Sequence, residues 1–231
     1  KRLLLFIFLL PTFVFSQKVL RDSVLIKSDI FTIMYSEKLE QPLWAKYEVK
    51  CPNGTASRAG MDFYTNDSVH TSDGNDYANN IYDKGHVAPA ADFNCDKPTL
   101  LKTFSYLNCV LQNQYLNRGV WRLLEVHERE LAKHTKIEVI VKVTFGTEKL
   151  KTGATVPTGF YKEIIGNGIN ECYYFNSEEN LIDQIIEIFF NQEIKQIQIE
   201  EDLIILLNGI LMYYIICYEG DANFHIHQLK K

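Results

Sequence analysis

The pattern of hydrophobic and polar residues is clearest between residues 18 and 50. In the stretch FTIMYSEKLEQPLWAKYEV, apolar side chains recur at close to every second position. This period of two is typical of strands that bury one face. The same alternation returns in KIEVIVKVTFG and in TGFYKEII, residues 136–146 and 158–165. We therefore expect strands before and after the middle of the chain.

The middle of the chain lacks this alternation. Residues 51–80 are polar and rich in Gly, Asn, Asp and Ser, which is typical of a long irregular or functional loop. Residues 99–134 have a helical pattern that is interrupted around 108–117. The sequence thus predicts strands, a long loop, two helical pieces and then further strands.

The N-terminal end resembles a targeting segment. Lys1 and Arg2 precede an apolar run over residues 3–15, and Ser16 closes a small-residue cleavage pattern. The run is too short to span a bilayer comfortably, because a spanning helix needs about 20 apolar residues. We expect residues 1–16 to be a cleaved secretory signal peptide, with an uncleaved anchor as the alternative. The mature chain is then secreted or periplasmic, without stable membrane association.

Charge and composition change near residue 170. The formal net charge is −5, yet residues 171–231 alone contain 11 Asp and Glu against 3 Lys and Arg. This acidic segment is rich in isoleucine and is ambiguous between helix and strand; we expect its apolar run 203–217 to be a packed element. We expect residues 17–170 to form one domain, and residues 171–231 to complete it or to be appended to it. Since an acidic tail can coexist with a neutral or basic face elsewhere, the net charge argues only weakly against a nucleic-acid partner.

The chain contains five cysteines, at positions 51, 95, 109, 172 and 217. An odd number cannot all pair within one chain, and individual bridges cannot be assigned from the sequence. Export permits disulfides. No C-x-x-C pair occurs, which argues against a zinc knuckle.

Two blocks contain the candidate chemistry. The first is Asp83-Lys84-Gly85-His86, which fits either a surface turn or a general base in a site that holds an anion. The second contains Asn117, Trp121, Glu125 and Arg129, one every four residues, which on a helix share one broad face. An amide oxygen, a carboxylate and a guanidinium on one face suit a hard cation together with an anion. Mg²⁺ prefers such oxygen ligands and keeps several waters.

Both blocks resemble motifs of the DNA/RNA non-specific endonuclease family, the ββα-metal nucleases. The first block is similar to their D-R-G-H motif. The second is similar to their N-x-x-P-Q, L-N, W, L-E and R signature, which runs here from Asn108-Cys109-Val110-Leu111-Gln112 through Leu116-Asn117, Trp121 and Leu124-Glu125 to Arg129. Upstream, SRAGMDFYTNDSVH resembles the arginine-containing segment of the family, with Arg58 at the arginine position; downstream, VTFGTEKLKTGATVPTGFYKEI resembles its closing strands. The resemblance covers roughly residues 40–165.

The resemblance implies an α+β fold, the ββα-metal or His-Me finger fold, with a central antiparallel sheet flanked by helices. It makes residues 17–170 the endonuclease domain. It also implies that His86 is the general base and that Asn117 is the single direct protein ligand of Mg²⁺, for which Mn²⁺ can substitute. Glu125 and Asp83 would orient metal-bound waters, and Asp83 would also organise the local backbone.

The remaining implied roles concern the substrate, DNA and RNA. Arg58 would clamp the scissile phosphate, and Lys84 would contribute to binding it. Arg129 would add positive charge or brace Glu125, and Asn108 would support the site by hydrogen bonding. The expected products carry a 5′-phosphate and a 3′-hydroxyl, with little base preference because recognition rests on the phosphodiester.

Two residues depart from the family pattern. Lys84 stands where the family usually has arginine, which keeps the charge but loses the bidentate fork. Leu111 replaces the usual proline before Gln112, which would loosen the turn that positions Asn108. The alternative hypothesis is a catalytically weak or silent member that binds nucleic acid or protein. The presence of both His86 and Asn117 favours the active enzyme, and the oligomeric state stays open, a homodimer included.

Each candidate also has a structural interpretation. Asn117 could be a helix cap, and Glu125 with Arg129 could be an ordinary ion pair four residues apart on a helix. We expect Trp121 to pack in the core. We also expect the other histidines of this region to be structural or solvated, namely His70, His127 and His134.

Overall fold

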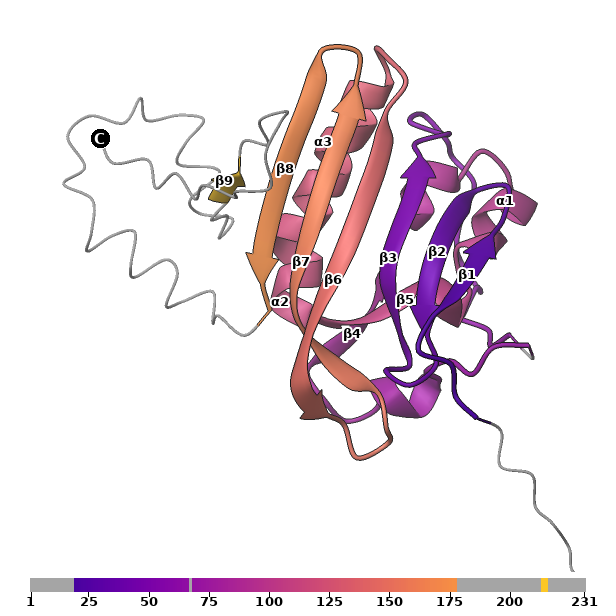
Figure 1. Cartoon of the computed structure of the whole chain (residues 1–231). Helices are drawn as coiled ribbons and strands as arrows, with labels where there is room; N and C mark the ends of the chain where they lie inside the picture. The colour runs from indigo at the N-terminus through magenta and orange to yellow at the C-terminus, as the bar shows by residue number, and fades with distance from the viewer. Residues whose placement is uncertain (1–18, 67, 178–212, 216–231) are drawn as a thin grey trace, which may run out of the picture.

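The computed structural model describes residues 19–66 and 68–177, together with the backbone of 213–215 (Figure 1). The predicted signal peptide, residues 1–16, and most of the acidic C-terminal segment lie outside these described residues. Within the described part of the chain, no helix is both long and apolar enough to cross a membrane.

The largest element is an antiparallel sheet of seven strands in the order β1-β2-β3-β6-β7-β8-β9. Its strands are β1 (Val24–Lys27), β2 (Phe31–Ser36), β3 (Gln41–Glu48), β6 (Glu138–Lys149), β7 (Thr155–Gly166), β8 (Ile169–Asn176) and β9 (Tyr213–Ile215). The strands expected from the period-two alternation are all present. All the described elements that lie outside this sheet belong to the connection between β3 and its neighbour β6. This connection therefore contains the candidate motifs.

A second sheet consists of only two antiparallel strands, β4 (Tyr82–His86) and β5 (Cys109–Asn113). The helical elements around it are η1 (Gly74–Tyr77), η2 (Ala90–Phe93), α1 (Lys97–Lys102), η3 (Tyr106–Asn108), α2 (Gln114–Leu116), η4 (Asn117–Trp121) and α3 (Arg122–Ala132). The prediction of two helical pieces over 99–134, broken around 108–117, matches α1 in part and the η4–α3 segment closely. Its interruption is a strand, because the apolar run Cys109–Leu111 is buried on both faces and such a run has no strand alternation.

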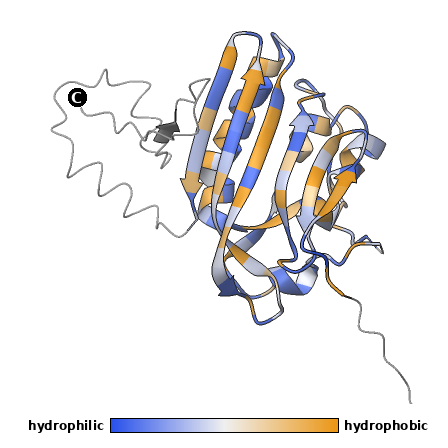
Figure 2. Cartoon of the chain, viewed as in Figure 1, coloured by the Kyte–Doolittle hydropathy of each residue, from blue (hydrophilic) through white to orange (hydrophobic). Residues whose placement is uncertain are grey.

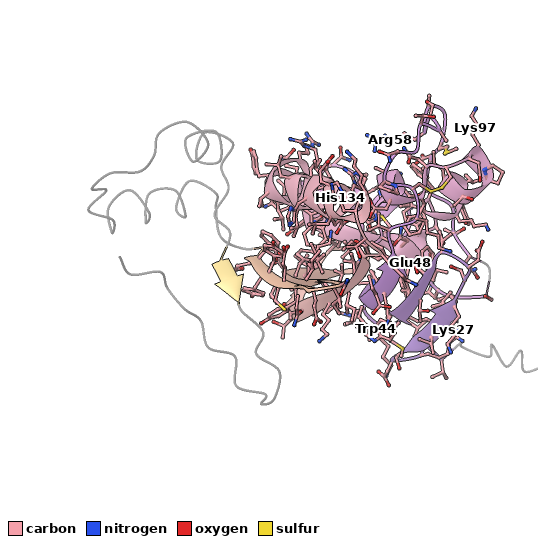
Figure 3. All side chains as sticks on the ribbon, turned by 90° about the horizontal axis from the view of Figure 1, so that it is seen from above. Lys27, Trp44, Glu48, Arg58, Lys97 and His134 are labelled. Carbon is pink, nitrogen blue, oxygen red and sulfur yellow. A yellow bond between two sulfur atoms is a disulfide. The ribbon has the colours of Figure 1, made fainter. Side chains whose placement is uncertain are left out.

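The core lies between the large sheet and helix α3, which covers one of its faces (Figure 1). Alternate residues of the strands point inward, so that Ile33, Val139 and Val141 are completely buried. Hydrophobic and polar residues alternate along these strands (Figure 2). Trp44 lies on the other side of the sheet from His134, which follows α3 (Figure 3). The α+β class, with a central antiparallel sheet flanked by helices, is confirmed.

Two further features bear on the domain boundaries and the cysteines. Strand β8 crosses residue 170 and pairs with β7 over its whole length, so residues 171–176 belong to the central sheet. Cys51 and Cys95 form a disulfide, which joins the start of the long loop to the segment after η2. Cys109 is a buried free thiol whose pKa is raised by burial.

Gly85 is required by the close contact between β4 and β5. It lies opposite Val110, and a Cβ added to it would come within 2.5 Å of Gln112 Oε1 and 2.7 Å of Gln112 Cβ. Cβ atoms in proteins do not approach other atoms so closely. The glycine next to His86 therefore leaves room for the Gln112 side chain where β4 and β5 pair side by side, which is a packing role.

Replacing Gly85 with alanine should destabilise the protein by about 1–3 kcal/mol, the usual cost of overpacking a well-packed site. The urea midpoint of the Gly85→Ala chain, compared with wild type, measures this. Gly74→Ala is the matched control, because the nearest atom to its added Cβ, Tyr106 Oη, would be 3.6 Å away. Equal midpoints for Gly85→Ala and wild type would contradict the packing role.

Candidate active site

A cleft of about 920 Å³ opens on the side of the molecule that carries the two motifs. Its lining comes from the long loop, from β4 and from the η4–α3 segment. The structure brings six of the eight predicted site residues into this lining: Arg58, Lys84, His86, Asn117, Glu125 and Arg129. The other two are not among the lining residues: Asp83 bonds to Asn117 and Arg118, which are, and Asn108 bonds to the backbone of Ala88, beside the lining residue Pro89.

His86 ends strand β4 and is held by aromatic rings. The ring centroids of Phe63 and Phe104 lie 4.7 Å and 4.9 Å from that of His86. Its Nε2 is buried and has no hydrogen-bond partner among the described residues. Burial first, and the nearby Arg58 guanidinium second, lower the pKa of His86 to about 3. The imidazole is therefore neutral near neutral pH.

Asn117, Asp83 and Arg118 form one hydrogen-bonded group at the edge of the cleft. Asn117 Nδ2 donates to Asp83 Oδ2 at 2.9 Å, while Arg118 donates to the same carboxylate through Nε at 2.8 Å and Nη2 at 2.6 Å. The Arg118 hydrogen bond holds the pKa of Asp83 below its usual range. Because Asp83 takes the amide nitrogen, the amide oxygen of Asn117 is the atom left to bind a cation.

Glu125 lies one helical turn into α3 and is the acidic residue among those that line the cleft. Burial raises the pKa of Glu125 to about 7, although Lys162 lowers it. A half-buried carboxylate of this kind is stabilised in its charged form by a cation placed beside it. Glu125 is thus suited to orient water around such a cation.

Arg129 makes no direct ion pair with Glu125, although its charge lowers the pKa of Glu125. Its Nη1 donates instead to Asp92 Oδ1 at 2.9 Å, and Asp92 is fully buried. The expectation of an ion pair four residues apart on the helix is wrong, because a carboxylate distant in sequence occupies the guanidinium. Arg129 still lines the cleft and contributes positive charge there.

The four residues spaced by four do not share one face. Residues 117–121 form a π-helical turn in which Gly119 has φ −94° and ψ −115°, outside the helical region. Trp121 therefore points into the core, where it is 1% exposed and packs edge-on against Phe160 and Phe175. The expected core role of Trp121 is confirmed. The prediction that all four residues share one face is wrong, because Asn117, Glu125 and Arg129 line the cleft while Trp121 lies in the core.

Asn108 and Leu111 organise the backbone behind His86. Asn108 Oδ1 accepts from the Ala88 N–H at 2.8 Å, and Asn108 Nδ2 donates to the carbonyls of Ala88 and Thr103 at 2.8 Å and 2.9 Å. These bonds fit the supporting role implied for Asn108. The Leu111 N–H donates to Gln41 Oε1 at 2.9 Å. A proline at this position would have no N–H to donate. The leucine, which departs from the family pattern, therefore allows a hydrogen bond to Gln41 at the start of β3.

Lys84 reaches the cleft but already has an anionic partner. Its Nζ donates to Asp62 Oδ1 at 2.8 Å and lies 5.5 Å from the centroid of the Tyr106 ring. Asp62 is 79% exposed, so this pair is open to competition by another anion. Arg58 lines the cleft and makes no ion pair within the described residues, which leaves its guanidinium available to a substrate.

The lining of the cleft contains more basic than acidic side chains although the whole chain is acidic. Five of its lining residues are basic, namely Arg58, Lys84, Arg118, Arg122 and Arg129, against the single acidic Glu125. Sequence reasoning missed Arg118 and Arg122, although their spacing of four next to Asn117 was a usable signal. It also missed Asp62 and Asp92, whose roles depend on contacts across 22 and 37 positions of the chain.

The remaining histidines lie elsewhere. His70 Nε2 is 3.2 Å from Glu40 Oε1, and His127 Nε2 is 2.8 Å from Glu171 Oε2. His134 is exposed after the end of α3. None of the three lines the cleft. This agrees with the structural or solvated roles expected for them.

The residues of the cleft fit a magnesium ion held mainly by water. Among the described residues, no three His, Cys, Asp or Glu side chains gather into a metal-binding group. Mg²⁺ does not require one, because it keeps several waters and needs few protein oxygens. The oriented amide oxygen of Asn117 would supply a direct ligand, and the charged form of Glu125 would suit the surrounding waters.

Removal of the Arg58 guanidinium should raise the pKa of His86, because the positive charge disfavours the imidazolium form. The pKa should stay below its ordinary value of 6.5, since burial is the larger cause. An NMR titration of the His86 ring in the Arg58→Ala chain measures this shift. Arg122→Ala is the control, as Arg122 also lines the cleft without affecting His86. A pKa that stays unchanged in Arg58→Ala would contradict the placement of Arg58 beside the ring.

Comparisons with known proteins agree with this geometry. The family model for DNA/RNA non-specific endonucleases matches residues 13–204. Mitochondrial endonuclease G of Bos taurus is 28% identical over 108 residues, which cover 45% of this chain and 36% of that protein. Mitochondrial nuclease EXOG of Danio rerio is 28% identical over 152 residues, covering 58% of this chain and 44% of that protein. The chain thus spans less than half the length of these curated relatives.

A solved structure shows the same fold. A chain in the crystal structure of the EndoG/EndoGI complex aligns with a TM-score of 0.58 at 25% identity, covering 67% of this chain and 74% of its own length. The family match extends beyond residue 170, past the limit of the motif resemblance, and includes β8 of the central sheet. Since the match covers most of the sequence, the chain belongs to the DNA/RNA non-specific endonuclease family.

Proposed function

We propose that this protein is a secreted, Mg²⁺-dependent endonuclease that hydrolyses phosphodiester bonds of DNA and RNA to 5′-phosphate and 3′-hydroxyl ends. The observation that carries this proposal is the pairing, in one basic cleft, of a neutral histidine with an amide oxygen held in place by Asp83. Secretion rests on the pattern of residues 1–16 alone. N-terminal sequencing of exported protein tests it, with Gln17 as the expected first residue.

The residues divide the work between substrate and water. Arg58 binds the scissile phosphate, with Lys84 added once the phosphate displaces Asp62. His86 accepts a proton from the water that attacks phosphorus, and its imidazole is in the neutral form that a proton acceptor requires. Asn117 would hold Mg²⁺, which when bound would supply positive charge against the charge that grows on the phosphate oxygens.

Glu125 and Asp83 act on the surroundings of the reaction. Asp83 fixes the amide of Asn117 so that its oxygen, not its nitrogen, points to the cation. Glu125 orients water beside it in its ionised form, which requires a pH above its pKa of about 7 or a nearby positive charge. Because the cleft contacts phosphate through charged side chains, little discrimination between DNA and RNA or between bases is expected.

Incubation of residues 17–231 with plasmid DNA or with RNA should give cleavage with Mg²⁺ and none with excess EDTA. Restoring Mg²⁺ after EDTA should restore cleavage, which shows that the chelator did not unfold the protein. End-labelling of the products distinguishes 5′-phosphate from 5′-hydroxyl ends. A folded chain that binds DNA but leaves it intact with Mg²⁺ or Mn²⁺ would instead support the alternative of a catalytically silent member.

A further inference from the structure

Arg129 reaches the cleft with most of its hydrogen-bonding capacity unused. Within the described residues its guanidinium makes one hydrogen bond, from Nη1 to Asp92 Oδ1 at 2.9 Å. An arginine has five N–H donors in a planar fork that matches the oxygens of a phosphate. The side chain is 17% exposed and lines the cleft. Its free donors are therefore placed where a phosphate would bind.

Asp92 is rigidly anchored beneath Arg129. Its backbone carbonyl accepts from the N–H groups of Lys50 and Cys51 at 3.1 Å and 2.9 Å. The Cys51–Cys95 disulfide fixes the same region. The side chain is fully buried, and burial together with the neighbouring Glu128 raises the pKa of Asp92 well above its usual range, while the Arg129 guanidinium lowers it. Burying such a group costs free energy. Here the buried Asp92 side chain directs the Arg129 guanidinium into the cleft.

A second buried ion pair stands behind the first. Glu128, the neighbour of Arg129 on α3, is completely buried, as is Lys162 on β7; Lys162 Nζ lies 2.9 Å from Glu128 Oε2. Tyr47 Oη on β3 donates to Glu128 Oε1 at 3.1 Å. Two strands of the central sheet thus fix the rotation of α3 at the turn that presents Arg129. The position of Arg129 is therefore fixed by contacts of α3 with the sheet as well as by Asp92.

We propose that Asp92 is a positioning residue that holds the Arg129 guanidinium in the cleft as a ligand for a phosphate of the nucleic-acid backbone, a proposal that rests on the proposed nuclease function. Arg129 thereby adds a phosphate contact to those of Arg58 and Lys84. Asp92 touches no substrate and acts only through Arg129. Asp92 lies in the segment that follows His86. One segment thus supplies both the proton acceptor and the residue that positions Arg129.

The test is a double-variant cycle on binding of a fluorescein-labelled single-stranded oligonucleotide, measured in EDTA on the chain carrying His86→Ala. Asp92→Ala and Arg129→Gln should each raise the Kd at least fivefold, and the double variant should be no weaker than Arg129→Gln alone within twofold. Each should also reduce the slope of log K against log salt by about 0.7, the change for one lost phosphate contact on a single strand. A purely structural role for Asp92 would not reproduce the slope change of Arg129→Gln.

Several controls keep the test decisive. Urea unfolding shows whether Asp92→Ala folds; if it does not, Asp92→Asn takes its place in the cycle and should give a smaller change in the same direction. Arg122→Gln removes another arginine of the cleft that does not contact Asp92, so its effect should multiply with that of Asp92→Ala. Independent effects of the Asp92 and Arg129 variants, or an unchanged salt slope, would overturn the proposal.

Cleavage is measured separately, with Mg²⁺ and with His86 in place. A parent chain that binds the oligonucleotide but never cuts would overturn the proposed nuclease function, while the coupling of Asp92 and Arg129 in binding would still support the positioning role. A parent that does not bind at all would overturn the phosphate role of Arg129. Failure of one proposal is thus distinguishable from failure of the other.

Discussion

Replacing His86 with alanine should lower the rate of phosphodiester cleavage about 10²- to 10⁴-fold, the usual contribution of a general base. The imidazole is neutral because it is buried between Phe63 and Phe104 and lies near Arg58, and alanine offers no proton acceptor at that place. Binding of the phosphate should change little, since a neutral ring contributes no charge to it. Initial rates on plasmid DNA at saturating Mg²⁺, together with the Kd for an oligonucleotide, separate the two effects.

His134→Ala is the matched control for this variant. His134 is exposed beyond the end of α3, outside the cleft, so its removal should leave the cleavage rate unchanged within twofold. The His86→Ala chain should unfold cooperatively in urea, which excludes loss of the fold as the cause of lost activity. Cleavage by folded His86→Ala at the wild-type rate would remove His86 from the mechanism and with it the proposed reaction.

The pattern of the sequence predicts the large sheet well and the site only in part. Strands β2, β3, β6 and β7 bury one face, so their alternation is visible in the sequence. Strand β5 is buried on both faces and therefore has no alternation, although it holds His86 in place through its pairing with β4. The motifs and the family resemblance identified six residues that line the cleft, but not Arg118 and Arg122.

Their partners could not be predicted, because each contact depends on tertiary packing. Asp92 reaches Arg129 only after the segment following β4 has folded beneath α3. The π-helical turn at Gly119 rotates Trp121 into the core and changes which residues share a face. The pKa of Glu125 depends on burial that no residue pattern records. The sequence indicated which residues belong to the site, but not how their side chains are oriented or protonated.

Replacing Asn117 with alanine should raise the Mg²⁺ concentration for half-maximal cleavage at least tenfold. Asn117 offers the cation an amide oxygen, and Asp83 fixes that oxygen by accepting a hydrogen bond from Nδ2 at 2.9 Å. With alanine the cation would be held by water and by the field of Glu125, which are weaker and less directional than an oxygen in a fixed position. A Mg²⁺ titration of initial cleavage rates, for the variant and for wild type, measures the change.

Asp83→Asn separates orientation of the ligand from its presence. The variant keeps the Asn117 oxygen but weakens the acceptor that fixes it, and loss of such an outer-shell partner typically costs about 10- to 100-fold in metal affinity or activity. Its Mg²⁺ requirement should therefore lie between those of wild type and Asn117→Ala. Asn167→Ala, in the exposed turn between β7 and β8, should titrate like wild type. A wild-type titration for Asn117→Ala would show that the cation binds elsewhere, and an Asp83→Asn chain weaker than Asn117→Ala would make the carboxylate itself the ligand.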